Sequence, residues 1–104
     1  MKKFIVHFSN KQQELMTKEL INDHVNYLKI LKENGVLSFC GSCVDGTAFM
    51  IIDAPSIGKA KRYVENDPFS KVDYYIDRKI VEIKEATLEN NFLLGKVLVN
   101  AEDE

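Results

Sequence analysis

The pattern of apolar and polar residues predicts how the chain begins. In residues 2–8, the apolar Phe4, Val6 and Phe8 alternate with Ile5 and His7, which predicts a first strand. From about Lys11 to Asn34, apolar residues recur at steps of three and four, and Gly35 follows as a stop signal. This spacing predicts a long amphipathic helix after the first strand.

Two extended runs follow the predicted helix. They are VLSFCGSCV at 36–44 and TAFMIID at 47–53. Asp45 and Gly46 lie between them, and this pair is favoured in tight hairpin turns. The two runs therefore predict antiparallel neighbouring strands.

The next segment predicts a second helix and a last strand. Ser56 is placed as the N-cap, with Ile57, Ala60 and Val64 on the buried face. Pro68 disfavours helical geometry before it, so the helix should end by about Asn66. Residues 72–83 predict the last strand, with a bulge near 77–79 where the alternation slips.

The order strand, helix, strand, strand, helix, strand predicts a ferredoxin-like βαββαβ fold of the α+β class. Right-handed crossovers close this order into a four-stranded antiparallel sheet with both helices on one face. The strands carry apolar side chains at both parities, for example Phe49 and Ile51 against Met50 and Ile52. We therefore expect a homodimer in which a second copy covers the open sheet face.

Size and charge narrow the class of protein. A chain of 104 residues, 45% hydrophobic and 29% charged, fits one domain. The net charge of -2, with scattered Lys and Arg, argues against nucleic-acid and membrane-surface partners. There is no apolar run of signal-peptide or membrane-spanning character, so we expect a cytoplasmic protein.

The motif CGSC, with Cys40 and Cys43, has the spacing of a thioredoxin-type redox pair but not its structural context. A redox pair of this kind opens a helix, whereas this one lies in an extended run. Only His7 and His24 remain as soft metal ligands, and neither has metal-site spacing. We therefore expect small buried thiols, no metal and no cofactor.

Asp67 and His24 form the candidate catalytic pair. Asp67 follows the carboxyl end of the second helix, where the helix dipole disfavours a negative charge, so it needs a partner. His24 lies on the sheet-facing side of the first helix, within reach of that partner position. Asp67 would then fix the imidazole tautomer and make His24 a stronger base. A packed neutral histidine bonded to a carbonyl, or a purely structural pair, are the alternatives.

Three segments together carry a family resemblance: HVNYLKILKENGVLSFCG, VDGTAFMIIDAPSIGKAKRYVENDPF and VDYYIDRKIVEI. They resemble the YCII-related domain family of the dimeric α+β barrel group, which includes muconolactone isomerase-like proteins, over residues 1–84. The resemblance implies a dimer with sheets packed face to face and a pocket in each subunit, with His24 and Asp67 as the active-site pair. Residues 85–104 are then a C-terminal extension that packs on the domain or on its dimer partner. Within this extension, Thr87 is expected to cap a short helix, and an apolar stretch follows from Val97 to Val99.

The resemblance also places further residues and two departures. Gly41 and Ser42 stand beside the implied pocket where relatives often carry Gly-Pro, and the Ser42 hydroxyl is available to a ligand. Relatives often carry an arginine where this chain has Ile21. An anionic ligand would therefore lack the positively charged side chain that binds it in those relatives. Apart from the resemblance, the aromatic residues Phe39, Phe69, Tyr74 and Tyr75 are expected to supply apolar walls.

Three functions remain open from the sequence. The first is a metal-independent isomerase, lyase or dehydrochlorinase in which His24, oriented by Asp67, acts as acid or base on a small cyclic or aromatic hydroxylated compound. The second is a small-molecule binding protein without chemistry. The third is a dimerisation module in which the pair is structural.

Overall fold

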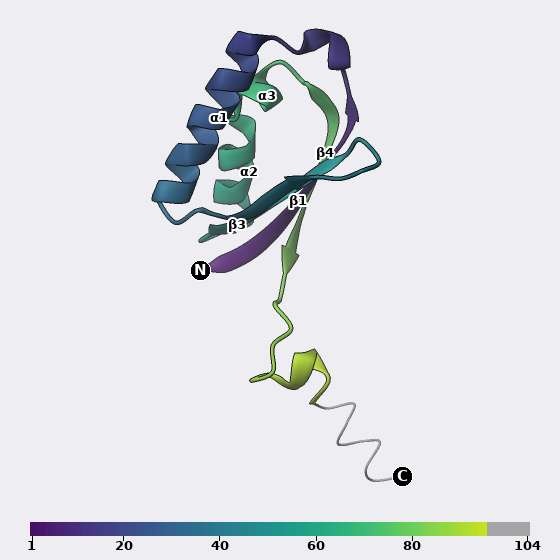
Figure 1. Cartoon of the computed structure of the whole chain (residues 1–104). Coiled ribbons are helices and arrows are strands. Elements are labelled where there is room, and N and C mark those ends of the chain that lie inside the picture. Colours follow the sequence, from purple (N-terminus) through teal and green to yellow (C-terminus); the bar gives the residue numbers. More distant parts are fainter. Residues whose placement is uncertain (96–104) are drawn as a thin grey trace.

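A four-stranded antiparallel sheet forms the centre of the molecule (Figure 1). The computed structural model describes residues 1–95. The strands lie in the order β2-β3-β1-β4, and their bounds are β1 Lys2–Lys11, β2 Leu37–Ser42, β3 Ala48–Ala54 and β4 Tyr75–Ile83. Every neighbouring pair is antiparallel, so the predicted ferredoxin-like fold is confirmed.

The helices pack on one face of this sheet (Figure 1). Their bounds are α1 Lys18–Glu33, α2 Ile57–Glu65 and α3 Pro68–Lys71, and two 3-10 turns, η1 and η2, span Gln13–Leu15 and Asn91–Leu93. No helix within the described residues is long and apolar enough to cross a membrane.

The core lies between the sheet and the helices. Alternate residues of β1, namely Phe4, Val6 and Phe8, are buried on the helix side. Their cross-strand neighbours Ile52 and Met50 on β3 are buried with them. Full burial of one such side chain contributes roughly 1.5–3 kcal/mol, so this strand alone fixes which sheet face the helices cover.

Helix α1 begins later than the sequence pattern predicts. Thr17 is its N-cap, and the Thr17 side chain accepts a hydrogen bond of 3.0 Å from the Leu20 N–H. The residues before it extend β1 as far as Lys11, which pairs with Tyr75. A cap with an available backbone partner therefore determines this boundary, whereas apolar periodicity runs past it.

Helix α2 agrees with the prediction, and a third helix follows it unpredicted. The Ser56 side chain accepts from the Lys59 N–H at 3.1 Å, and Asn66 is the C-cap. Ala60 and Val64 are buried as expected, but Ile57 is exposed. The short helix α3 follows because proline fits the first turn of a helix as well as it ends one.

The expected bulge in the last strand is absent, and the irregularity lies in β2 instead. The pairing of β4 with β1 keeps one register from Lys3 opposite Ile83 to Lys11 opposite Tyr75. The register between β2 and β3 shifts between Leu37 and Phe39. This shift reverses the side-chain alternation for the rest of β2.

Residues 85–95 leave the end of β4 and extend away from the sheet (Figure 1). The hydrogen bonds of this segment are local, such as the bond of 3.3 Å from the Asn90 N–H to the Thr87 hydroxyl. The N-cap of η2 is Asn90, whose side chain accepts from the Leu93 N–H at 3.1 Å, and not Thr87 as expected. The expected apolar stretch from Val97 to Val99 lies outside the described residues.

Candidate active site

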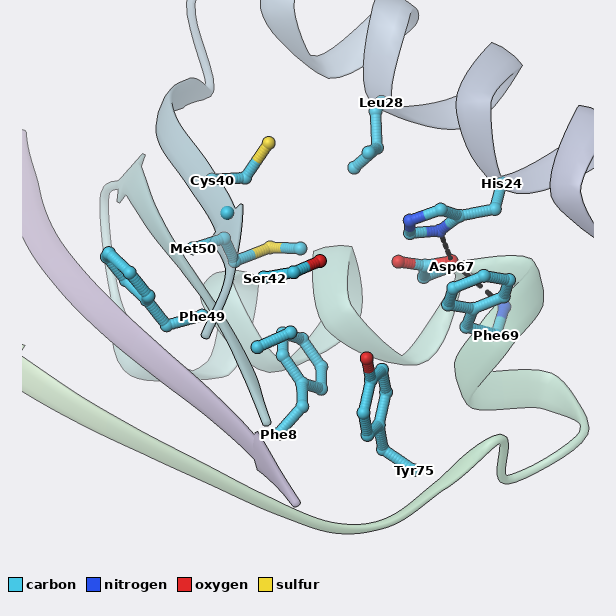
Figure 2. A pocket seen from close by; sticks show the side chains of 12 residues that line it. Phe8, His24, Leu28, Cys40, Ser42, Phe49, Met50, Asp67, Phe69 and Tyr75 are labelled. Carbon is cyan, nitrogen blue, oxygen red and sulfur yellow. Dashed lines mark hydrogen bonds and ion pairs between the residues drawn. The ribbon is translucent and has the colours of Figure 1, made fainter. Parts of the chain in front are cut away.

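A cavity of about 180 Å³ lies between the helices and the sheet (Figure 2). His24 and Leu28, one turn apart on α1, form one wall. Asp67 and Phe69, from the turn between α2 and α3, form a second wall. The helix-facing side of the sheet forms the remaining wall. Side chains of α1, of the turn between α2 and α3 and of the sheet therefore meet at this cavity.

His24 and Asp67 are directly bonded. The distance from His24 Nδ1 to Asp67 Oδ1 is 2.7 Å. The Asp67 side chain is only 2% exposed, and the same Oδ1 accepts a second hydrogen bond of 2.9 Å from the Phe69 N–H. An ionised carboxylate only accepts hydrogen bonds, so Nδ1 carries the proton in this arrangement. Nε2 is then left as an acceptor, and it points into the cavity (Figure 2).

Phe69 fixes the plane of the imidazole. The Phe69 and His24 rings stack with centroids 3.7 Å apart and planes 4° from parallel. Phe69 also contacts Tyr74, with ring centroids 4.7 Å apart. The imidazole is thus held by Asp67 at its edge and by Phe69 on its face, so its orientation is set before any ligand binds.

Tyr27 joins α1, which carries His24, to α2, which ends just before Asp67. It lies three residues after His24 on α1, and its hydroxyl donates a hydrogen bond of 2.5 Å to the Tyr63 carbonyl on α2. Burial, with the nearby charge of Asp67 and the Tyr63 side chain, raises the pKa of Tyr27 to about 12. Tyr27 therefore stays protonated at neutral pH and keeps this bond.

The sheet side of the cavity is mostly apolar but offers three polar side chains. They are Cys40, Ser42 and Tyr75. The Ser42 and Tyr75 hydroxyls point into the cavity (Figure 2), and neither bonds a side chain or backbone group of residues 1–95. Burial, with Tyr74 and Cys43, raises the pKa of Tyr75. The cavity therefore presents hydroxyl groups on the sheet side and Nε2 of His24 on the helix side.

The structure brings most of the sequence-predicted site residues together. His24, Asp67, Gly41, Ser42 and Phe69 all line the cavity. Phe69 does so mainly as a support for the imidazole.

Phe39 lies elsewhere. It is 55% exposed on the opposite sheet face, where its ring stacks on Phe49 at 5.4 Å. The register shift after Leu37 explains this, because it turns Phe39 outward and Cys40 inward. Sequence reasoning missed Cys40 as a cavity residue for the same reason.

The cysteines differ from the expected buried thiols. Cys40 is exposed toward the cavity, Cys43 is half-buried, and both are free. Within residues 1–95, no group of three or more His, Cys, Asp or Glu side chains is placed to hold a metal ion.

Comparison with known families identifies the family of this chain. The model of the YCII-related domain matches residues 1–84. The chain belongs to the YCII-related domain family. Among curated proteins, none matches this YCII-related chain in sequence.

A solved structure is similar to this YCII-related domain. It is 5-chloro-2-hydroxyhydroquinone dehydrochlorinase (TftG) from Burkholderia phenoliruptrix AC1100. The TM-score is 0.65 at 22% sequence identity, and the match covers 80% of this chain and 94% of TftG. At this identity the similarity establishes the fold of the YCII-related domain.

Proposed function

We propose that this protein catalyses acid–base chemistry on a small hydroxylated ring compound, with His24 as the base and Asp67 as its orienting carboxylate. The observation that carries the proposal is the 2.7 Å bond from Nδ1 to Oδ1, which leaves Nε2 free to face the cavity. A ligand hydroxyl beside Nε2 would give up its proton there. The imidazolium that forms would be stabilised by Asp67.

The size of the cavity supports a single ring. An apolar protein cavity of roughly 150 Å³ accommodates benzene. A cavity of about 180 Å³ therefore has room for one six-membered ring with small substituents. The lining includes no Lys or Arg among the described residues, which disfavours a ligand with a permanent carboxylate.

The structural neighbour points to the same ligand class. TftG is named as a dehydrochlorinase of a hydroxyhydroquinone, and it was solved with 2,5-dihydroxybenzoquinone. Both compounds are single hydroxylated rings. We therefore propose isomerisation of such a ring, or elimination of a leaving group from it, as the reaction class of this chain.

We also propose that the working form is a homodimer. The sheet face opposite the helices carries half-buried or exposed apolar side chains, among them Ile5, Phe39, Ile51 and Val81. A second copy would remove this surface from water. The two free cysteines fit a reducing compartment, in agreement with the expected cytoplasmic location.

The test compares His24→Gln with His7→Gln. Each variant removes one of the two imidazoles, and His7 is exposed on the open sheet face, outside the cavity. The measurements are chloride release from 5-chloro-2-hydroxyhydroquinone and proton–deuterium exchange into hydroquinone and catechol. We expect the wild type and His7→Gln to be active, and His24→Gln to lose about 10²–10⁴-fold in rate.

Two results would contradict this proposal. Equal activity in His24→Gln and the wild type would remove His24 from the chemistry. Binding of these rings without exchange or turnover would favour the alternative of a binding protein without chemistry.

A further inference from the structure

The hydroxyl of Tyr75 is a polar group of the cavity that has no part in the acid–base chemistry proposed for His24 and Asp67. Tyr75 begins β4, and its ring packs against Phe8 at 5.6 Å and against Tyr74 at 5.0 Å between centroids. These contacts fix the ring, while the hydroxyl points into the cavity (Figure 2). No side chain or backbone group of residues 1–95 accepts from it or donates to it.

The protonation state of this hydroxyl makes it a donor. Burial raises the pKa of Tyr75, and Tyr74 and Cys43 add to that effect. Tyr75 is therefore a neutral phenol at neutral pH. A phenol that is partly removed from water gains most from a ligand atom that accepts its hydrogen bond.

We propose that Tyr75 is a second catalytic residue, which donates a hydrogen bond to a ligand oxygen conjugated through the ring with the hydroxyl that faces His24. This inference rests on the proposed function, and it adds a preference for the ligand. The preferred ring carries a hydroxyl and, across its conjugated system, a carbonyl or similar acceptor oxygen.

The step is a proton transfer in which all atoms and electrons are accounted for. The O–H bond of the ligand hydroxyl breaks, and its proton forms the Nε2–H bond of His24. The electron pair left on the ligand spreads through the ring to the acceptor oxygen. Tyr75 stabilises the negative charge there by a hydrogen bond and keeps its own proton, while Asp67 stabilises the imidazolium.

The arrangement of the cavity favours this division of roles. Nε2 of His24 lies on the helix side and accepts, whereas Tyr75 lies on the sheet side and donates. A ring that lies between them would meet the two groups through oxygens at different ring positions. The apolar side chains around it, such as Leu28 and Met50, would strengthen both hydrogen bonds by excluding water.

The test uses two phenols of similar size, 4-nitrophenol and 4-methylphenol. The first has an acceptor oxygen conjugated with its hydroxyl, and its ionised form absorbs visible light. The second has no such oxygen. Dissociation constants are measured for the wild type, Tyr75→Phe and Tyr74→Phe, with thermal unfolding as a check of the fold. Tyr74→Phe is a matched control, because it removes one oxygen from the neighbouring residue, whose hydroxyl contacts Gln13 outside the cavity.

We expect Tyr75→Phe to raise the dissociation constant of 4-nitrophenol by about tenfold or more. The dissociation constant of 4-methylphenol should rise by less than about twofold. Tyr74→Phe should leave both constants within about twofold of the wild type. The visible absorption of bound 4-nitrophenol should be present in the wild type and reduced in His24→Gln.

Three results would overturn the inference. They are equal weakening of both phenols in Tyr75→Phe, no effect of that substitution on either phenol, or no binding of 4-nitrophenol to the wild type. Any of these leaves the comparison of His24→Gln with His7→Gln intact, so failure of this inference and failure of the proposed function are distinguishable.

Discussion

Oδ1 of Asp67 accepts two hydrogen bonds, one from His24 Nδ1 and one from the Phe69 N–H. The first bond orients the imidazole, and the second caps α3. The helix that follows therefore supplies a donor to this carboxylate, in addition to the imidazole. This also explains how a carboxylate can be 2% exposed just beyond the end of α2.

This shared oxygen determines the outcome of two substitutions. In Asp67→Asn, the amide oxygen should keep the Oδ1 position, because the amide nitrogen would otherwise face the Phe69 N–H as a second donor. We expect this variant to retain both the Nδ1–H tautomer of His24 and the cap. Asp67→Ala should lose both bonds, and loss of the cap alone costs about 0.5–2 kcal/mol.

¹⁵N NMR of the imidazole and urea unfolding of the wild type and both variants measure these effects. An Nε2–H tautomer in Asp67→Asn would show that the amide has turned round. Equal stability of Asp67→Asn and Asp67→Ala would show that the Asp67 side chain contributes nothing as a cap.

At the level of single residues, the sequence predicts which groups pair but not how they are held. The phase of His24 on its helix and the position of Asp67 before Pro68 are enough to predict that the two meet. Stacking of Phe69 on the imidazole depends on α3, which turns that ring back toward α1. Pro68 is compatible with a helix end and with a helix start, so the pattern alone does not distinguish them.

At the level of elements, Tyr27 links α1 to α2 and so sets the distance across which His24 and Asp67 meet. Its hydrogen bond to the Tyr63 carbonyl should stabilise the fold by about 0.5–1.5 kcal/mol, which Tyr27→Phe would remove at neutral pH. The difference between wild type and variant should also depend on pH.

The direction of this pH dependence follows from the raised pKa of Tyr27. In the unfolded chain a tyrosine ionises near pH 10, whereas folded Tyr27 ionises at about 12. The stabilisation is therefore complete below pH 10 and is lost as pH rises toward 12. We expect urea unfolding curves of wild type and Tyr27→Phe to converge over this interval. Parallel loss of stability in the two proteins would contradict the assignment, because Tyr75 is present in both.

The elements also show where sequence patterns lose precision. Hairpin and helix caps are local features, and Asp45-Gly46 and Ser56 are found as predicted. The register shift in β2 is not local, because it depends on how Leu37 pairs with Ile52 on β3. Regular alternation would place Phe39 on the same face as Leu37, in the cavity wall. One extra residue in β2 therefore places Cys40, and not Phe39, in the cavity wall.

At the level of the whole molecule, the open sheet face has the composition of an interface. Apolar side chains of several strands occupy it, including Ile5, Phe39 and Val81. At one end of the sheet, Lys3 bonds Asp53 at 2.9 Å, and Ser38 donates to the same carboxylate at 2.8 Å. His7 and Lys79 lie among these apolar side chains. Apolar side chains with polar groups between and beside them are compatible with a surface that binds another protein.

Substitution of Phe39 tests whether this residue belongs to the dimer interface or to the ligand site. If it belongs to the interface, Phe39→Asp should weaken dimerisation by about tenfold or more, because an unpaired charge would be buried between the sheets. Binding of a ring compound to each chain should persist, since Phe39 lies outside the cavity.

The control is Val44→Asp, which introduces the same charge at a fully exposed apolar residue of the β2–β3 hairpin. Sedimentation equilibrium over a range of concentrations, with ligand titrations on the same samples, gives both quantities. A Phe39→Asp protein that dimerises like the wild type but no longer binds the ring compound would contradict this prediction. It would show that Phe39 belongs to the ligand site and that the open sheet face is not the dimer interface.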